Sequence, residues 1–374
     1  MSRPFLSVVM PVHQGSGVLP QSLRALVASD LPRHEWELIV VDDVSTDNSI
    51  LLAAQYADVV VRLAGKPRGP AYARNRGFEA SRGEILVFID SDVCVHPETL
   101  GRFAAAFRGN LDIASIFGSY DASPPGAGVV SQFRNLMHHY VHTCNPGEAE
   151  TFWAGCGAVR ADVFADVGMF DEWHYSRPQI EDIELGRRLR LQGHRIVLDP
   201  AIQCTHLKRW TLSNMLSTDL KHRGTAWMWL LLKEGASASG GSLNLRVVEK
   251  LCTALVGAAG VALAAALVMR NVLPLVIALL AFMGVVVLQR RFYDYLRRQR
   301  GIVFALQAIP IHILCYVVNG VSVFSGWLMH KLFGEPIPPA DVSAQADVGI
   351  QTWPPGPARP LRSIWAGSAK TAQS

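Results

Sequence analysis

The chain has 374 residues, half of which are hydrophobic, and a formal net charge of only +4. This length suits one large domain with additional elements, or two domains. The small net charge does not indicate a nucleic-acid-binding protein, and the hydrophobic fraction is high for a soluble one. Most of the apolar excess lies after Leu251.

The six cysteines form no Cys-x-x-Cys pair, and two of them lie in the apolar C-terminal region. This distribution argues against a disulfide framework and a zinc site, and it fits a reducing compartment. The apolar run at 5–12 superficially resembles a signal peptide, but His13 and Gln14 follow it without a small-residue cleavage site. We interpret this run as a first buried strand.

Short β-branched runs alternate with helical patterns over residues 5–230. This alternation predicts an α/β domain with a mostly parallel sheet, covered on both faces, that binds ligands at the carboxyl ends of its strands. The expected strands are 6–12, 37–41, 58–62, 84–89 and 195–198. The expected helices are 19–29, 47–56, 71–81, 133–142, 179–192 and 213–233.

A stretch rich in Gly, Ser and Ala at 235–242 marks a domain boundary. We expect a globular domain over 1–233, with an amphipathic, interfacial helix near 213–233. A linker over 234–250, a membrane region over 251–333 and a disordered tail over 334–374 follow.

The membrane region contains three apolar stretches, expected as helices at 251–269, 272–288 and 302–329. The first two are uncharged and form a tight hairpin that crosses a membrane. The third is interrupted by Pro310 and His312, so the sequence leaves open whether it spans or is a broken, partly interfacial helix.

Arginine predicts the orientation of these helices. Segment 289–300 holds five arginines, whereas the turn between the first two stretches holds only Arg270. The positive-inside rule places 289–300 in the cytoplasm, and the N-terminal domain, two spans away, lies there too. The sequence therefore predicts a multi-pass protein of the cell (inner) membrane.

Carboxylates follow two of the expected strands. Asp90 and Asp92 end the strand at 84–89, and both can reach a divalent cation or a ribose from one loop. Hard cations such as Mg²⁺ and Mn²⁺ prefer carboxylate oxygen and bind phosphates. Asp42 and Asp43 end the strand at 37–41, where a carboxylate can accept from a base N–H or a ribose hydroxyl.

A Gly-Pro turn at 69–70 opens a helix that carries Arg74 and Arg76. Helix N-termini and arginine both favour phosphate, although both arginines also suit a solvated helix face.

These motifs, in this order, resemble glycosyltransferase family 2, whose members are inverting enzymes with the GT-A fold, a Rossmann-like, mostly parallel mixed sheet. The resemblance rests on the runs 7–12, 41–47 and 73–77 and on the pair Asp90 and Asp92, and it covers about residues 5–210. It implies that the domain over 1–233 is the catalytic domain, followed by the transmembrane helices. By resemblance, the nucleobase contacts Pro11, Val12 and Asp43, with Asp42 as the neighbour of Asp43. The base or phosphate lies near Arg74, the ribose faces Asp90, and Asp92 binds the metal.

The second half of the domain carries a Glu-Asp motif, and by resemblance Asp182 is the base that deprotonates the acceptor. Glu181 and Glu184 are alternatives, and early acidic residues also suit a helix N-terminus. By resemblance, the loop with Trp153 and Gly155 lines the donor sugar and acceptor.

A partial Gln-x-x-Arg-Trp motif ends the resemblance. Arg209 and Trp210 are present, and in processive members the equivalent residues bind diphosphate and stack on the acceptor. The chain has His206 where glutamine is expected, and this His is a candidate third metal ligand or a structural residue.

We therefore expect a transferase that uses Mg²⁺ or Mn²⁺ and a nucleotide-sugar, with a UDP-sugar favoured, to glycosylate a lipid or lipid-linked acceptor at the cytoplasmic membrane face. A processive polysaccharide synthase is the first alternative, although two or three spans make a poor channel. A non-catalytic nucleotide-sugar-binding scaffold and a nucleotidyltransferase are others, and Asp90, Asp92 and Asp182 argue against the scaffold.

Overall fold

The structure is a computed structural model that describes residues 3–234, 247–334 and 351–353. The described residues form two compact units. The first unit contains the residues up to Tyr120, Pro146–Leu207 and 351–353, and the second contains Asp121–Asn145 and the residues from Lys208 to 334. Residues 121–145 and 208–233, which we expected within the N-terminal domain, therefore group with the C-terminal helices.

The first unit is built on one mixed sheet with the strand order β10-β3-β2-β1-β4-β8-β6-β9-β5. Its parallel half contains β1 (Leu6–Val12), β2 (Trp36–Asp42), β3 (Val59–Arg62) and β4 (Ile85–Ile89). The expected parallel sheet is thus confirmed for the strands that precede the two acidic pairs.

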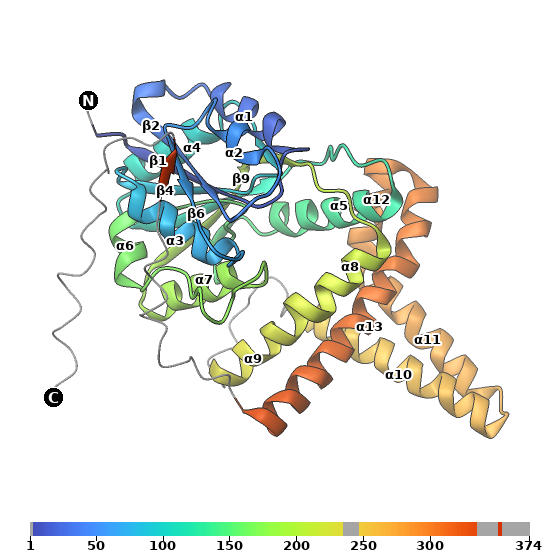
Figure 1. Cartoon of the computed structure of the whole chain (residues 1–374). Helices are drawn as coiled ribbons and strands as arrows, with labels where there is room; N and C mark the ends of the chain where they lie inside the picture. The colour runs from blue at the N-terminus through green and yellow to red at the C-terminus, as the bar shows by residue number, and fades with distance from the viewer. Residues whose placement is uncertain (1–2, 235–246, 335–350, 354–374) are drawn as a thin grey trace. The chain divides into compact units, whose positions relative to one another are not determined.

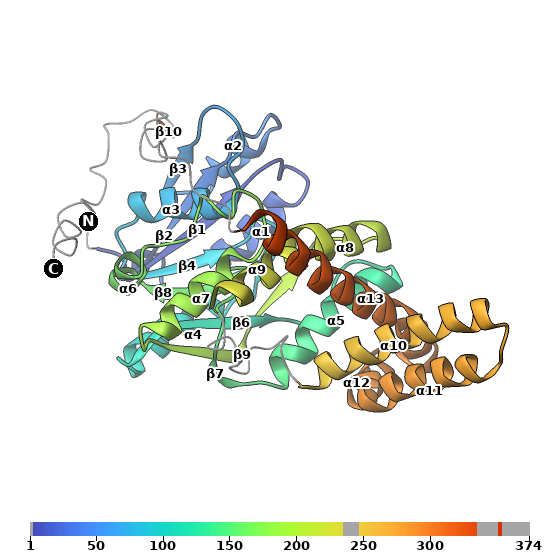
Figure 2. The same cartoon turned by 90° about the horizontal axis from the view of Figure 1, so that it is seen from below.

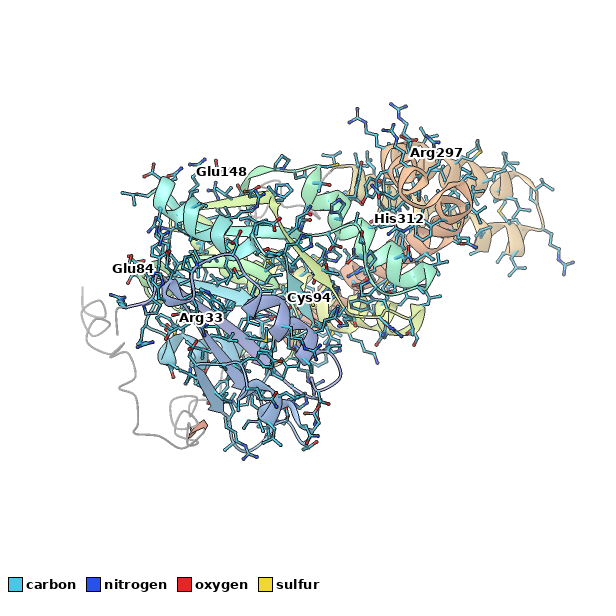
Figure 3. All side chains as sticks on the ribbon, turned by 90° about the horizontal axis from the view of Figure 1, so that it is seen from above. Arg33, Glu84, Cys94, Glu148, Arg297 and His312 are labelled. Atoms are coloured by element: carbon cyan, nitrogen blue, oxygen red, sulfur yellow. The ribbon has the colours of Figure 1, made fainter. Side chains whose placement is uncertain are left out.

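The other half of the sheet contains β9, whose first residues were expected as the strand 195–198, and several strands that sequence patterns did not reveal. β8 pairs antiparallel with both β4 and β6, and β6 is parallel to β9. Figure 3 labels Cys94 on β5 and Glu148 on β7, the two short strands that pair antiparallel with β9, and Figure 2 shows β10 beside β3. The bounds are β5 (Val93–Val95), β6 (Ile113–Tyr120), β7 (Gly147–Ala149), β8 (Cys156–Arg160), β9 (Arg195–His206) and β10 (Gln351–Trp353).

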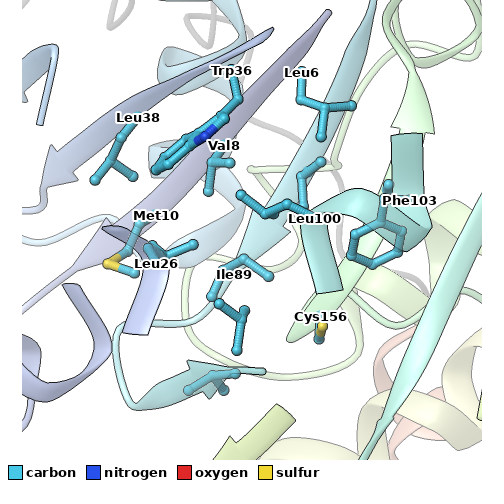
Figure 4. Close-up of a cluster of buried hydrophobic side chains, with 14 of the residues drawn as sticks. Leu6, Val8, Met10, Leu26, Trp36, Leu38, Ile89, Leu100, Phe103 and Cys156 are labelled. Carbon is cyan, nitrogen blue, oxygen red and sulfur yellow. The ribbon is translucent and has the colours of Figure 1, made fainter. Parts of the chain in front are cut away.

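Helices cover both faces of this sheet (Figure 1). On one face, side chains such as Val8 and Met10 pack against Leu26 and Phe103 (Figure 4), and burial of each such side chain contributes about 1.5–3 kcal/mol. The helices of this cluster are α1 (Leu19–Val27), α2 (Ser49–Ala53) and α4 (Thr99–Gly109), and η1 (Arg33–Glu35) precedes β2. The opposite cluster contains α3 (Pro70–Ala80), α6 (Ala161–Asp166) and α7 (Glu181–Leu191).

The second unit is helical. Its N-terminal contribution is α5 (Val129–Thr143), and α8 (Leu212–Thr218), the π-helix η2 (Asp219–Gly224) and α9 (Thr225–Glu234) form one uninterrupted run. The other helices are α10 (Val247–Met269), α11 (Leu273–Leu288), α12 (Arg290–Arg300) and α13 (Ile302–Phe333).

Two described helices, α10 and α13, are long and apolar enough to cross a membrane by length and composition. The 16 residues of α11 are too few for that criterion alone, but α11 and α12, bent by 65° at their junction, satisfy it together. The third apolar stretch was left open between a span and a broken helix; the structure has one continuous helix, and α13 runs through Pro310.

The segment at 289–300, which we expected to be a loop, is helix α12. Its apolar residues Phe292, Tyr293 and Leu296 are buried in one cluster with Phe133 of α5, while Arg297 lies on the outer side (Figure 3). This amphipathic pattern stabilises a helix where the arginines alone indicated a loop. The expected linker and tail lie mostly outside the described residues.

The close packing of α3 on the sheet gives a test of the first unit. A Cβ at Gly77 would lie 2.3 Å from Cγ1 of Val9 and 3.1 Å from Cγ2 of Val41, both of which are buried. We expect Gly77→Ala to destabilise the chain by roughly 1–3 kcal/mol through overpacking, measured as a lower Tm of the full chain in detergent. Gly109→Ala, where a Cβ meets nothing within 4 Å, is the control; equal Tm values for both variants would contradict this packing.

Candidate active site

The carboxyl ends of β1, β2 and β4 meet at one edge of the sheet. Val12 pairs with Asp42, and β1 also pairs with β4, whose last residue precedes Asp90. Pro11 and Val12 are buried at this edge. The structure therefore brings together the strand ends at which the sequence placed nucleotide-binding residues.

Asp42 and Asp43 have different surroundings. Both carboxylate oxygens of Asp43 accept the backbone N–H of Arg68, at 3.0 Å each, and one also accepts that of Gly69 at 2.7 Å. Gly69 has a φ of +88°, which favours glycine, so Asp43 holds the turn that opens α3. Asp42 accepts from the N–H of Ser45 through Oδ1, while its buried Oδ2 has no hydrogen-bond partner among the described residues. Burial raises the pKa of Asp42.

Arg74 joins three elements. Its guanidinium donates to Asp90 at 2.7 Å and to Glu181 at 2.9 Å, and its side chain is 4% exposed. Burial alone would lower the pKa of Arg74, but the charges of Asp90 and Glu181 raise it above its ordinary value. Burial raises the pKa of Asp90, and Asp92 adds to this rise while Arg74 opposes it. Arg74 therefore links α3 to the end of β4 and the start of α7.

Asp182 lies in the first turn of α7, one turn before Gly186. A Cβ at Gly186 would lie 2.2 Å from the backbone nitrogen of Phe152, so only glycine permits this approach of α7 to the loop before β8. In that position Oδ2 of Asp182 accepts the N–H of Ala154 at 3.2 Å. Burial and the neighbouring charge of Glu181 raise the pKa of Asp182 to about 7, with Arg74 opposing the rise.

The other acidic residue of this turn, Glu184, is engaged elsewhere. Its carboxylate pairs with Arg188 at 2.6 Å, and Arg188 also donates to the carbonyl oxygen of Met169 at 2.6 Å. The carboxylate of Glu184 therefore stabilises the packing of α7 on the segment after α6.

Asp92 and His206 form a second pair at the sheet edge. Nε2 of His206 lies 3.5 Å from Oδ2 of Asp92, and the imidazole stacks on Tyr120 with ring centroids 4.4 Å apart. The edge of Trp153 meets Tyr120 at 4.7 Å, and Gly155 leaves room for the indole, which a Cβ would approach to 2.6 Å. In the part of the chain that the structure describes, no group of three or more His, Cys, Asp or Glu side chains is arranged to hold a metal ion.

Arg209 and Trp210 belong to the second unit. Trp210 is buried, with the Lys208 ammonium 4.2 Å from its ring centroid and Arg134 5.6 Å away, whereas Arg209 is exposed. The structure does not group this pair with the residues of the first unit described above.

Sequence reasoning missed Tyr120 and Gly186. Tyr120 ends β6, a strand that was not expected, so nothing in the chain order placed it against His206. Gly186 lies inside a helix, where glycine lowers helix stability. Its presence at this position was the sequence feature that indicated a close contact with another segment.

Residues 7–168 match the family described as Glycosyl transferase family 2. The glycosyltransferase AglE of Haloferax volcanii is 28% identical over 176 residues, which are 45% of this chain and 56% of AglE. The undecaprenyl-phosphate 4-deoxy-4-formamido-L-arabinose transferase of Pseudomonas fluorescens is 34% identical over 115 residues, or 29% of this chain and 34% of that protein. The chain thus spans about half or less of these relatives. The family resemblance expected from the motifs is confirmed.

A solved structure has a similar fold. The mannosyltransferase PcManGT from Pyrobaculum calidifontis, in complex with GDP-Man and Mn²⁺, matches with a TM-score of 0.57 and 18% identity over 82% of this chain and 87% of that one. This likeness confirms the fold class and shows nothing further about ligands.

The carboxyl of Asp182 gives a test that needs no substrate. We expect it to titrate at about pH 7, protonated below and charged above, seen by infrared spectroscopy as a carbonyl-stretch band that disappears as the pH rises. Asp182→Asn should lack this band. Glu181→Gln removes a negative neighbour and should move the midpoint to lower pH. A midpoint near the ordinary value of about 4 in the unsubstituted chain would contradict the environment described.

Proposed function

We propose that the chain, whose residues 7–168 match glycosyltransferase family 2, transfers a sugar, with inversion, from a nucleotide-diphosphate sugar to a lipid or lipid-linked acceptor. The observation that carries the proposal is the carboxyl of Asp182, whose pKa of about 7 suits a general base at neutral pH. The hydrogen bond from Ala154 orients this carboxyl.

In the proposed reaction, the oxygen of an acceptor hydroxyl attacks the anomeric carbon while Asp182 removes the proton of that hydroxyl. The bond from that carbon to the diphosphate breaks on the opposite face, and the nucleoside diphosphate leaves. Trp153, Gly155 and Glu181 surround the proposed acceptor and sugar side. Glu184 is not proposed as the base, because it pairs with Arg188.

The nucleotide is proposed to lie along the strand ends, against Pro11 and Val12. The unpartnered oxygen of Asp42 suits a ring N–H of uracil or guanine better than Asp43 does, since Asp43 already accepts two backbone N–H groups. Asp90 then faces the ribose, and Arg74 holds Asp90 in place. A UDP-sugar is the donor we favour, and a GDP-sugar is the comparison, because PcManGT was solved with GDP-Man.

Asp92 and His206 fit a divalent cation. Their facing oxygen and nitrogen atoms are two ligands of a suitable kind, and phosphate oxygens and water complete six-coordinate sites of Mg²⁺ or Mn²⁺. When bound, such an ion neutralises charge on the leaving diphosphate. An imidazole ligand favours Mn²⁺ over Mg²⁺.

The membrane setting of the proposal rests on the apolar helices and on α12. By the positive-inside rule, the arginines of α12 support a cytoplasmic position for that helix, and the acceptor would be reached from there. The Pseudomonas relative, which is named for transfer to undecaprenyl phosphate, supports a lipid-linked acceptor. The burial of Trp210 beneath Lys208 and Arg134 counts against the processive alternative, because its ring offers no open face to a sugar.

The base is tested with the purified full chain in detergent, Mn²⁺ or Mg²⁺, a panel of UDP- and GDP-sugars and a membrane lipid extract. We expect nucleotide release with a glycolipid product, and a fall in kcat of roughly 10²–10⁴-fold in Asp182→Asn with donor affinity almost unchanged. Glu184→Gln, on the same helical turn, is the control and should retain transfer. Loss of transfer in the control but not in Asp182→Asn would overturn the assignment.

The metal site is tested by titrating Mn²⁺ into the full chain with UDP and following the electron paramagnetic resonance signal of free Mn²⁺. Asp92→Asn and His206→Asn should each raise the Kd by roughly 10- to 100-fold. His174→Asn is the matched control, because His174 forms another His–Asp pair, 2.6 Å from Asp171 in the same unit. An unchanged Kd in His206→Asn would remove this residue from the site.

A further inference from the structure

Helix α13 contacts different partners along its length. Its first turns, with Phe304 and Ala308, pack in one cluster with Phe133 and Phe292 of α5 and α12. Its middle, at Ile313 and Tyr316, packs against α10 and α11. Its last turns meet α9, where Trp229 donates to the carbonyl oxygen of Gly326 at 3.2 Å.

The hairpin of α10 and α11 touches α13 only near its base. Cys252, Val256 and Val285, at the start of α10 and the end of α11, share a cluster with Tyr316. Farther along the hairpin, the described cluster of Ala259, Ala262, Ala278 and Ala281 contains no residue of α13. The hairpin therefore projects away from α13, as Figure 1 shows, and does not lie alongside it.

Polar bonds mark this base. Gln289, at the end of α11, donates to Glu249 of α10 at 3.0 Å and to Tyr316 of α13 at 2.6 Å, and Tyr316 donates to Glu249 at 2.6 Å. Three helices are thus joined at one level. Beyond this level, from Cys252 to Leu288, Arg270 at the turn is the one charged residue.

The helix run from α8 to α9, unlike the hairpin, packs along α13. Met215 shares a cluster with Phe304, and a Cβ at Gly224 would lie 2.2 Å from the Ser322 hydroxyl oxygen. Met228 packs beside Gly326 in the same way. The run therefore lies along α13 in the same direction over most of its length.

This accompanying run carries charge in its middle. Asp219 pairs with Arg134 of α5 at 2.7 Å, and the neighbouring basic residues are Lys221, His222 and Arg223. If α13 crossed the membrane, these groups would lie inside the hydrocarbon, where ionisable side chains are costly. In the part of the chain that the structure describes, no such charged helix accompanies the hairpin. From Cys252 to Met269 the hairpin extends about 27 Å, close to the hydrocarbon thickness of about 30 Å.

We propose that the α10–α11 hairpin crosses the membrane and that α13 does not, but lies along the membrane surface across the base of the hairpin. The proposed lipid-facing stripe of α13 is exposed and apolar, and the hairpin also exposes many apolar residues. The stripe consists of Val303, Leu306, Val317, Val321, Phe324 and Leu328. The arginines of α12 then lie at headgroup level, where phosphates attract them. Both ends of α13 lie on one side of the membrane.

The first test uses full-chain variants that each carry one introduced, exposed cysteine, labelled with a membrane-impermeant maleimide before and after permeabilisation of cells. The background is Cys144→Ser, because the other five cysteines are buried. We expect R298C and K331C, at the start and end of the surface segment, to react from the same side, and N271C from the other. Reaction of R298C and K331C from opposite sides, or of N271C from the side of R298C, would overturn the proposal.

The second test measures depth by spin labels at Val317, in the middle of α13, and at Val261, which is 72% exposed on α10. Collisions with a water-soluble nickel complex and with oxygen report the depth of each label. We expect the Val317 label to be shallow and the Val261 label deep; equal, deep positions would mean that α13 spans. Neither measurement uses sugar transfer, so failure of the proposed function would leave these outcomes interpretable.

Discussion

The buried guanidinium of Arg74 is the interaction on which the candidate site depends. Asp90, Asp92, Glu181 and Asp182 bring four carboxylates to one region of the first unit, and Arg74 binds two of them, from β4 and α7, at 2.7 and 2.9 Å. Without this cation, burial and mutual repulsion would favour protonation of these carboxyls or separation of the two elements. Arg74 therefore links the two elements and makes a cluster of carboxylates compatible with a folded sheet.

Close backbone packing supplies the second constraint. Gly186 allows α7 to approach the loop before β8, and this approach gives Asp182 a hydrogen bond from Ala154. The same loop presents Trp153 to Tyr120, which stacks on His206 beside Asp92. The proposed base and the proposed metal ligands are thus positioned by one short segment, so a shift of that segment would disturb both.

In the second unit, neighbours rather than composition distinguish the helices. Both α10 and α13 are long and apolar enough to cross a membrane. Among the described residues, α13 is accompanied by a helix with Asp219, Lys221 and Arg223, whereas the α10–α11 hairpin is held together along its length by alanines that pack on each other. A surface-lying α13 would broaden the contact of this unit with the lipid interface, which suits an enzyme whose acceptor lies in the membrane.

The sequence by itself determined the fold class, the family and the acidic motifs, because a parallel sheet fixes where its strands end and which residue types follow them. It also determined that the C-terminal region is apolar. Tertiary structure decided how each carboxylate is engaged: Asp43 with the turn before α3, Glu184 with Arg188, and Asp182 with the backbone N–H groups of Ala154 and Ile183. It likewise placed Tyr120 against His206. It also showed that the arginine-rich segment forms helix α12 and that Trp210 is buried. These outcomes depend on contacts between segments far apart in the chain, and local sequence patterns do not predict such contacts.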